Sequence, residues 1–464
     1  MSYIKLALVP SNPVTGDIPG NAEGIFQAWL VAREKDADLV LTPEMSLTGY
    51  LIDDLATRES FDRAARRELE NLARRTAEGP ALIVGLPWRE EGRVYNALAL
   101  LDRGEIVTLR FKHHLPNYGV FDEKRVFVPG AFPEPVDFRG VKIGLANCED
   151  IWVPDVCTHL KDRGAEFLLV PNGSPFRAGK HARRLEIARA RARETGLNLI
   201  YLNQHSGQDE LVFDGGAFTV TAEGSAREII PRFSDEQAVI ETGNLSGLPE
   251  VSDRSWDEEV YAAICLGLRD YVRKNRFPGV LLGLSGGIDS ALAAAIAADA
   301  LGPDRVQAIM MPSHFTSDES LEDAAACARN LGIDYRLIPI SGPLAAMEET
   351  FETGELSGLA HENAQSRLRG LILMSLSNRH GGMLVATGNK SEMAVGYATL
   401  YGDMCGGYNP VKDLYKGDVY RLARWRNNWG KEPVIPERIL TRPPTAELRE
   451  DQKDSDTLPE YDEL

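Results

Sequence analysis

Short apolar runs bounded by Gly, Pro, Asn or Asp recur through the first half of the chain, with polar stretches between them. Runs of this length are typical of β-strands. Segments 61–76 and 181–195 instead repeat apolar residues every three or four positions, which predicts amphipathic helices. The predicted strands are residues 4–10, 38–43, 81–87, 94–101, 141–147, 167–171 and 198–203.

These strands and helices mix without strict alternation, which predicts a layered α/β sandwich. From residue 213 to 240 the pattern becomes meander-like, and we interpret it as the end of a sheet. Residues 242–253, TGNLSGLPEVSD, then combine Gly, Pro and small polar residues as linkers do. We therefore predict one domain at 1–246 and a second at 247–464.

Regular alternation of strands and helices characterises the second domain. Such alternation predicts a parallel sheet with helices packed against it, a Rossmann-like arrangement. The predicted strands are 280–284, 306–311, 335–340 and 383–387, and the predicted helices are 256–274, 290–300, 321–331 and one that contains Arg367 and Arg369. The acidic tail from Asp451 onward is a candidate for disorder.

The length of 464 residues fits two domains, each able to bury a core. No apolar run is long enough to cross a bilayer, and the segment MSYIKLALVPSNP does not resemble a signal peptide, so we expect a cytoplasmic protein without a membrane partner. A net charge of −18 argues against a nucleic-acid partner. The five cysteines are odd in number and lack metal-ligand spacing, which predicts mostly buried thiols.

Three reactive side chains end predicted strands of the first domain: Glu44, Lys112 and Cys148. Together they suit attack of a thiol on an amide, because a carboxylate can take the thiol proton and a cation can stabilise the oxyanion. The backbone N–H of Glu149 is a second candidate oxyanion donor. The strings LTPEMSLTGY, FKHHLPNYGVFDEKRVF and LANCEDIW resemble the glutamine amide hydrolase domain of the nitrilase superfamily over residues 1–246.

This resemblance implies a four-layer α-β-β-α sandwich in which Glu44 is the general base, Lys112 the oxyanion stabiliser and Cys148 the nucleophile. It also implies that Tyr118, Ser174 and Lys180 hold the α-amino and carboxylate ends of glutamine. Two questions stay open at this point. Glu123 either orients Lys112 or forms a surface ion pair with Arg125, and only one of His113 and His114 can face the site.

A second site is indicated by GVLLGLSGGIDSALAAAIA, an apolar strand, a small-residue loop and a helix that begins near Asp289. Gly286 and Gly287 allow the backbone to approach a phosphate, and the helix N-terminus offers unpaired N–H groups. The loop lacks the Lys of a Walker motif. The hexapeptide Ser285-Gly286-Gly287-Ile288-Asp289-Ser290 instead resembles the pyrophosphate loop of ATP pyrophosphatases.

Downstream strings MMPSHFTSDESLEDA, ENAQSRLRG, LVATGNKSEMAVGYATLYGD and KDLYKGDVYRLA resemble bacterial glutamine-dependent NAD synthetases over 256 to about 455. Members of that family continue into a helical C-terminal tail beyond the segment EYDEL. The resemblance implies the substrates glutamine, ATP and deamido-NAD, Mg²⁺ on Asp289 and Glu392, and a homo-oligomer. It assigns ATP to Ser285, Gly286, Gly287, Asp289, Ser290, Thr387 and Lys416, and deamido-NAD to Asn363, Arg367, Arg369 and Asp403.

Three other functions stay open at this stage. A synthetase with an inactive glutaminase half would use ambient ammonia, and the intact Glu44, Lys112 and Cys148 argue against it. A related enzyme that thiolates tRNA would need nucleic-acid contacts and sulfur-handling cysteines, and Cys405 has no evident partner. A non-catalytic nucleotide sensor would release no AMP in response to deamido-NAD.

Overall fold

The computed structural model describes residues 3–352, 354–430, 432–450, 452, 454–456, 458–459, 461 and 463. The chain divides into two compact units, Met1–Trp256 and Asp257–Leu464. Asp451, where the predicted disordered tail begins, lies outside the described residues, but the prediction is wrong for part of the tail: Asp454–Asp456 form a 3₁₀ turn, and Gln452 and Asp454 are buried. In the described part of the chain, no helix is both long and apolar enough to span a bilayer.

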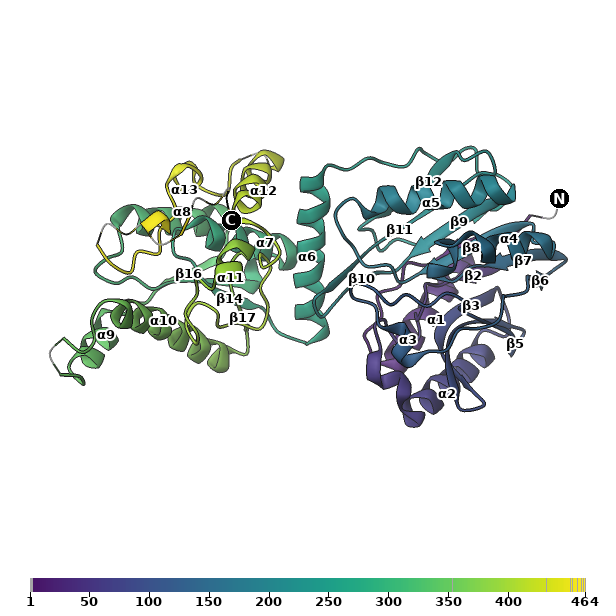
Figure 1. Cartoon of the computed structure of the whole chain (residues 1–464), viewed down its shortest axis with the longest axis horizontal. Coiled ribbons are helices and arrows are strands. Elements are labelled where there is room, and N and C mark those ends of the chain that lie inside the picture. Colours follow the sequence, from purple (N-terminus) through teal and green to yellow (C-terminus); the bar gives the residue numbers. More distant parts are fainter. Residues whose placement is uncertain are drawn as a thin grey trace. The chain divides into compact units, whose positions relative to one another are not determined.

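Two sheets form the centre of the first unit (Figure 1). The six-stranded sheet has the order β13-β1-β2-β3-β4-β5, and the other has the order β10-β11-β9-β8-β7-β6 with β12 paired to β11. Strands β1, β2 and β3 are parallel, as are β7, β8 and β9. The strands are β1 (Lys5–Leu8), β2 (Leu39–Leu41), β3 (Ala81–Glu90), β4 (Arg93–Asp102), β5 (Glu105–Phe111), β6 (Val136–Phe138), β7 (Val141–Leu145), β8 (Phe167–Asn172), β9 (Asn198–Asn203), β10 (His205–Gln208), β11 (Leu211–Val220), β12 (Ala226–Arg232) and β13 (Ala238–Glu241).

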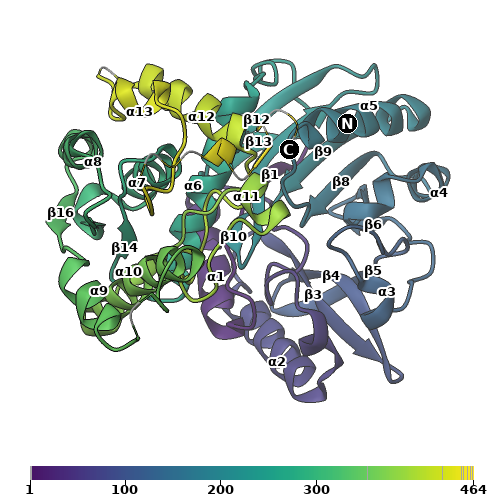
Figure 2. The same cartoon turned by 60° about the vertical axis from the view of Figure 1, so that its left-hand side comes forward.

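Alternating side chains explain why the sheets stack. In β1, Leu6 and Leu8 face the core between the sheets, whereas Ala7 points to the helical side. Helices α1 (Ile18–Glu34) and α2 (Glu59–Arg75) cover the six-stranded sheet, and α4 (Pro154–Asp162) and α5 (Lys180–Thr195) cover the other. The predicted α-β-β-α sandwich is therefore confirmed, and Figure 2 shows its layers from α5 through β9 and β3 to α2. The unit also contains the short helix α3 (Glu123–Val126) and the 3₁₀ turns η1 (Asp53–Thr57) and η2 (Cys148–Ile151).

A parallel four-stranded sheet, β16-β15-β14-β17, forms the core of the second unit. The chain runs from β14 through β15 to β16 and then returns to β17 on the other side of β14, so the strand order reverses beside β14. Open parallel sheets bind ligands at such a point. The elements are β14 (Val280–Gly283), β15 (Val306–Met310), β16 (Asp334–Leu337), β17 (Met383–Val385), α6 (Trp256–Lys274), α7 (Ile288–Leu301), α8 (Asp318–Leu331), α9 (Ser341–Glu348), α10 (Leu359–His380), α11 (Lys390–Val395), α12 (Lys416–Trp429), α13 (Glu437–Thr441), η3 (Pro303–Arg305) and η4 (Asp454–Asp456).

One interpretation of the pattern is corrected by the topology. The meander at 213–240 does not end a single sheet, because β11 and β12 belong to one sheet while β13 pairs antiparallel with β1 in the other. The last strand of this segment, β13, therefore connects the two sheets. The prediction of mostly buried cysteines is confirmed: Cys148, Cys157 and Cys327 are buried, Cys265 and Cys405 are partly buried, and all five are free thiols.

Candidate active sites

Glu44 and Lys112 meet in a buried polar cluster of the first unit. Glu44 follows β2 and Lys112 follows β5, and neither side chain is exposed. Lys112 Nζ lies 2.7 Å from Glu44 Oε1. The other oxygen of Glu44, Oε2, accepts the backbone N–H of Gly173 at 2.9 Å. Glu44 is thus held between the two sheets, since Gly173 follows β8 of the second sheet.

Cys148 completes this cluster from the second sheet. It begins the 3₁₀ turn after β7, with a φ of +51°, in the left-handed region that non-glycine residues adopt uncommonly. The thiol is buried, and it lies close enough to Glu44 for the carboxylate to affect its pKa. Burial and the Glu44 carboxylate raise the pKa of Cys148 well above its usual value. The resting residue is therefore a neutral thiol next to a carboxylate that can accept its proton.

Lys112 carries a stable positive charge at this site. Burial opposes its charge, but the carboxylates of Glu123 and Glu44 outweigh burial and raise the pKa of Lys112 well above its usual value. A protonated amine beside Cys148 can donate to a developing oxyanion. Because the raised pKa of Cys148 keeps the thiol protonated, Lys112 does not maintain a resting thiolate here.

Glu123 belongs to the cluster and not to the surface. It is 3% exposed, and its Oε2 lies 3.0 Å from Lys112 Nζ. Arg125 instead pairs with Asp54 and Asp122, so the alternative of a Glu123–Arg125 surface pair is wrong. Sequence reasoning missed Asn96, whose Nδ2 donates to Glu44 Oε1 at 2.7 Å and to Glu123 Oε1 at 3.0 Å. The signal available in the sequence was a polar residue, Asn96, inside a run of apolar residues.

His113 and His114 serve the site through their backbone. Their N–H groups donate to Asp150 Oδ1 at 3.0 and 2.8 Å, and Asn147 N–H donates to Asp150 Oδ2 at 3.1 Å. Burial raises the pKa of Asp150 to about 7. Asp150 therefore joins the segment after Lys112 to the turn that carries Cys148.

Tyr118, Lys180 and Glu149 lie close enough to Cys148 to interact with it electrostatically. Tyr118 is 53% exposed, and its hydroxyl donates to Glu149 Oε2 at 2.9 Å. Burial, followed by the neighbouring Arg184, lowers the pKa of Lys180 to about 8. Burial raises the pKa of Glu149. Sequence reasoning used only the backbone of Glu149 and missed its carboxylate, which next to Cys148 is the charge that can receive an ammonium group.

Ser174 is held by a buried ion pair. Arg184 Nη1 lies 2.8 Å from Asp214 Oδ1, with both side chains at most 2% exposed. The same guanidinium donates through Nε to Ser174 Oγ at 3.2 Å and through Nη2 to Ser174 O at 2.8 Å. This pair fixes the segment that also contains Gly173, the donor to Glu44.

The glycine loop of the second unit connects β14 to α7 at the point where the strand order reverses. Ser285 N–H donates to Ser290 Oγ, and Gly287 N–H donates to Ser285 Oγ, both at 3.2 Å. Gly286 has a φ of +84°, and a Cβ there would lie 2.6 Å from Ser320 O. Glycine is therefore required at 286 by both conformation and space.

Asp289, Glu392 and Lys416 converge beside this loop. Lys416 Nζ lies 2.5 Å from Asp289 Oδ2 and 3.3 Å from Glu392 Oε1. Burial and the charge of Asp289 raise the pKa of Glu392 to about 7. Asn389 Nδ2 donates to Asp289 Oδ1 at 2.9 Å. The two carboxylates thus face a common position that attracts a cation.

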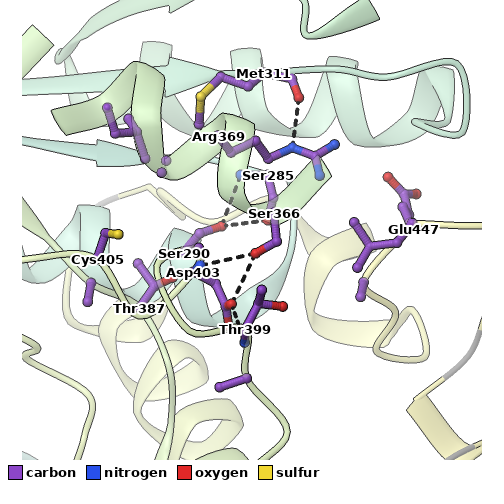
Figure 3. A pocket seen from close by; sticks show the side chains of 18 of the residues that line it. Ser285, Ser290, Met311, Ser366, Arg369, Thr387, Thr399, Asp403, Cys405 and Glu447 are labelled. Carbon is purple, nitrogen blue, oxygen red and sulfur yellow. Dashed lines mark hydrogen bonds between the residues drawn. The ribbon is translucent and has the colours of Figure 1, made fainter. Parts of the chain in front are cut away.

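A cavity of about 520 Å³ adjoins the loop (Figure 3). Arg369 Nε donates to Met311 O at 3.0 Å, and burial lowers the pKa of Arg369 to about 10. Thr399 Oγ1 donates to Asn363 Oδ1 at 2.8 Å, and Thr399 N–H donates to Asp403 Oδ1 at 2.7 Å. The predicted residues among those that line the cavity are Ser285, Ser290, Asn363, Arg369, Thr387 and Asp403.

Arg367 is the predicted residue that the structure places elsewhere. Its side chain is exposed, it does not line the cavity, and its Nε donates to Leu400 O at 3.2 Å. The predicted phosphate and metal residues Gly286, Gly287, Asp289, Glu392 and Lys416 line a smaller cavity of about 240 Å³, together with Ser285, Ser290, Thr387 and Asp403.

Comparison with known families defines the class. The carbon-nitrogen hydrolase family model matches residues 5–241, and the NAD synthase family model matches residues 260–464. The glutamine-dependent NAD(+) synthetase of Rhodobacter capsulatus is 46% identical over 99% of this chain and 86% of its own length, and that of Acinetobacter baylyi is 40% identical over 100% and 87%. The chain belongs to the glutamine-dependent NAD(+) synthetase family.

A solved structure agrees with this membership. Glutamine-dependent NAD+ synthetase from Acinetobacter baumannii, determined in complex with adenosine diphosphate, is 38% identical. The match covers 96% of this chain and 86% of that one, with a TM-score of 0.89.

Proposed function

We propose that this protein hydrolyses glutamine in its first unit and uses the ammonia in its second unit to amidate deamido-NAD at the expense of ATP. The observation that carries this proposal is the buried contact of 2.7 Å between Lys112 Nζ and Glu44 Oε1, with the buried Cys148 thiol near the same carboxylate. Burying polar and charged groups costs stability, so the buried cluster of Glu44, Lys112 and Cys148 argues against an inactive glutaminase half.

Glu44 takes the thiol proton as Cys148 Sγ attacks the side-chain carbonyl of glutamine. The negative charge that develops on the carbonyl oxygen is stabilised by Lys112. Glu44 then gives the proton to the departing nitrogen, which leaves as ammonia, and a glutamyl thioester remains. Water, deprotonated by Glu44, attacks the thioester and releases glutamate and the free thiol.

Residues near Cys148 recognise the two ends of glutamine. Lys180 and Ser174 bind the α-carboxylate, and Tyr118 and Glu149 bind the α-ammonium group. The support is electrostatic: Lys180 is charged below its pKa of about 8, and the Glu149 carboxyl group lies near Cys148, so the two groups suit the opposite charges of a free amino acid.

In the second unit the nicotinate carboxylate of deamido-NAD attacks the α-phosphorus of ATP and expels pyrophosphate. The acyl adenylate is then attacked by ammonia, which gives NAD and AMP. Ser285, Gly286, Gly287, Ser290, Thr387 and Lys416 hold the phosphates, and Asn363, Arg369 and Asp403 hold the dinucleotide in the adjoining cavity.

Asp289 and Glu392 are the residues that would hold Mg²⁺. Carboxylate oxygens are its preferred protein ligands, and the ammonium of Lys416 between them shows that this position accepts positive charge. When bound, Mg²⁺ neutralises phosphate charge. Burial and the charge of Asp289 raise the pKa of Glu392 to about 7, and a bound cation would favour its ionised form.

We further propose a homo-oligomer whose interface lies on the second unit. Leu371 on α10 and Leu400 and Tyr401 in the following loop are 64%, 64% and 82% exposed. Arg367 joins the helix to the loop through its bond to Leu400 O. Because Arg367 lies on this apolar surface and outside the cavity, it would reach the deamido-NAD of a second copy.

The test is a coupled assay with glutamine, ATP, Mg²⁺ and deamido-NAD, with nicotinic acid mononucleotide as a competing acceptor. We expect NAD, AMP, pyrophosphate and glutamate to form in equal amounts. Glutamate release without NAD, or preference for the mononucleotide, would contradict the proposed acceptor.

A further inference from the structure

A second anion-binding group faces the phosphate cavity from the start of α8. Ser317 is the N-cap of this helix and accepts Ser320 N–H at 3.2 Å. Arg442 Nη1 donates to Ser320 Oγ at 2.8 Å. The helix N-terminus, two hydroxyls and a guanidinium thus gather at one position, which together favour a negatively charged oxygen.

That position is filled by a side chain of the protein itself. Glu447 Oε1 lies 2.8 Å from Ser317 Oγ, 2.8 Å from Ser320 Oγ and 2.6 Å from Arg442 Nη2. All three donors converge on a single carboxylate oxygen. The backbone of Glu447 has a φ of +49°, in the left-handed region that non-glycine residues adopt uncommonly.

The group is continuous with the glycine loop. Ser320, Arg442 and Glu447 line the same cavity of about 240 Å³ as Ser285–Ser290 and Lys416. The backbone of Gly286 packs directly against Ser320 O. Glu447 also faces the larger cavity, where its charge partly offsets the burial of Arg369 (Figure 3).

We propose that Ser317, Ser320 and Arg442 form a binding site for the terminal phosphate oxygens of ATP, and then of pyrophosphate, and that Glu447 occupies this site when no phosphate is bound. An incoming phosphate takes over the three donors, and Glu447 turns away. After the adenylate forms, the returning carboxylate competes with pyrophosphate and favours its release. This inference rests on the proposed function of the loop.

The test is binding of inorganic pyrophosphate to the full-length protein by calorimetry, in the presence of Mg²⁺. Glu447→Gln removes the competing charge at constant shape, so we expect pyrophosphate to bind about tenfold more tightly. Arg442→Gln should weaken binding. Unfolding curves of each variant show whether the fold is kept.

The double variant Arg442→Gln with Glu447→Gln shows whether Arg442 binds phosphate or only pairs with Glu447. If Arg442 binds phosphate, the double variant binds pyrophosphate at least about tenfold more weakly than Glu447→Gln alone. Equal affinities of these two proteins would overturn the proposal, as would unchanged affinity in Glu447→Gln. Because binding is measured without catalysis, failure of NAD synthesis would be recognised separately.

Discussion

The protonation of individual side chains determines how the first site works. Burial and Glu44 keep Cys148 a neutral thiol, whereas two carboxylates keep Lys112 charged. Under the proposed mechanism, attack by Cys148 is coupled to proton transfer to Glu44, because the thiol starts out protonated. Asn96 and Gly173, which donate to Glu44, orient the carboxylate for this transfer.

The charge of Lys180 predicts that glutamine binding depends on pH. The Lys180 pKa of about 8 means that the amine is charged below that pH and loses its charge above it. If Lys180 binds the α-carboxylate of glutamine, KM for glutamine rises as the pH passes from about 7 to about 9. Lys180→Arg keeps its charge throughout, so its KM should change less.

The pH profile of KM for both proteins is the measurement. Titration of the α-amino group of glutamine affects both equally, which makes Lys180→Arg the matched control. A rise of the same size in both proteins would show that Lys180 does not bind the carboxylate.

Secondary-structure elements place the second site. Strand β14 ends and α7 begins where the strand order reverses, so the loop between them meets the first turns of α8 and α12. The small-residue string in this loop has a steric reason, since Gly286 touches Ser320 O. Side chains from separate helices, Asp289 and Lys416, can then meet over the loop.

Two substitutions in the loop test this steric account. Gly286→Ala places a Cβ 2.6 Å from a backbone oxygen at a φ of +84°, so we expect about 1–3 kcal/mol of destabilisation and loss of ATP-dependent pyrophosphate release. Gly287→Ala is the matched control for stability, because its nearest contact would be Ser285 Oγ at 3.3 Å. Denaturant unfolding of both variants is the measurement. Equal stability would contradict the proposed constraint.

Local sequence patterns predicted the elements better than their pairing. The alternation around β14 and the run before Glu44 are short-range signals, and both were interpreted correctly. The pairing of β13 with β1 joins residues at least 230 positions apart and leaves no local signal. The same limit applies to Glu123, whose burial depends on contacts with Lys112 and with Tyr50, which donates to it from 73 positions away.

At the scale of the whole molecule, the apolar surface of the second unit predicts assembly. Leu400→Glu introduces a charge where we expect a second copy to pack, so the variant should sediment as a monomer and show a raised KM for deamido-NAD. Val107→Glu, at a residue 55% exposed on β5 of the first unit, is the control and should leave the assembly unchanged. Unchanged sedimentation of Leu400→Glu would place the interface elsewhere.

We propose that the first unit releases nitrogen and that the second unit uses it. The most direct test of this division is the rate of NAD formation by Cys148→Ala with glutamine and, separately, with ammonium. We predict that glutamine-dependent synthesis falls at least about a thousandfold, while ammonium-dependent synthesis stays close to that of the unchanged protein. Loss of both activities in a folded variant, or retention of the glutamine-dependent one, would contradict the division of labour proposed for this chain.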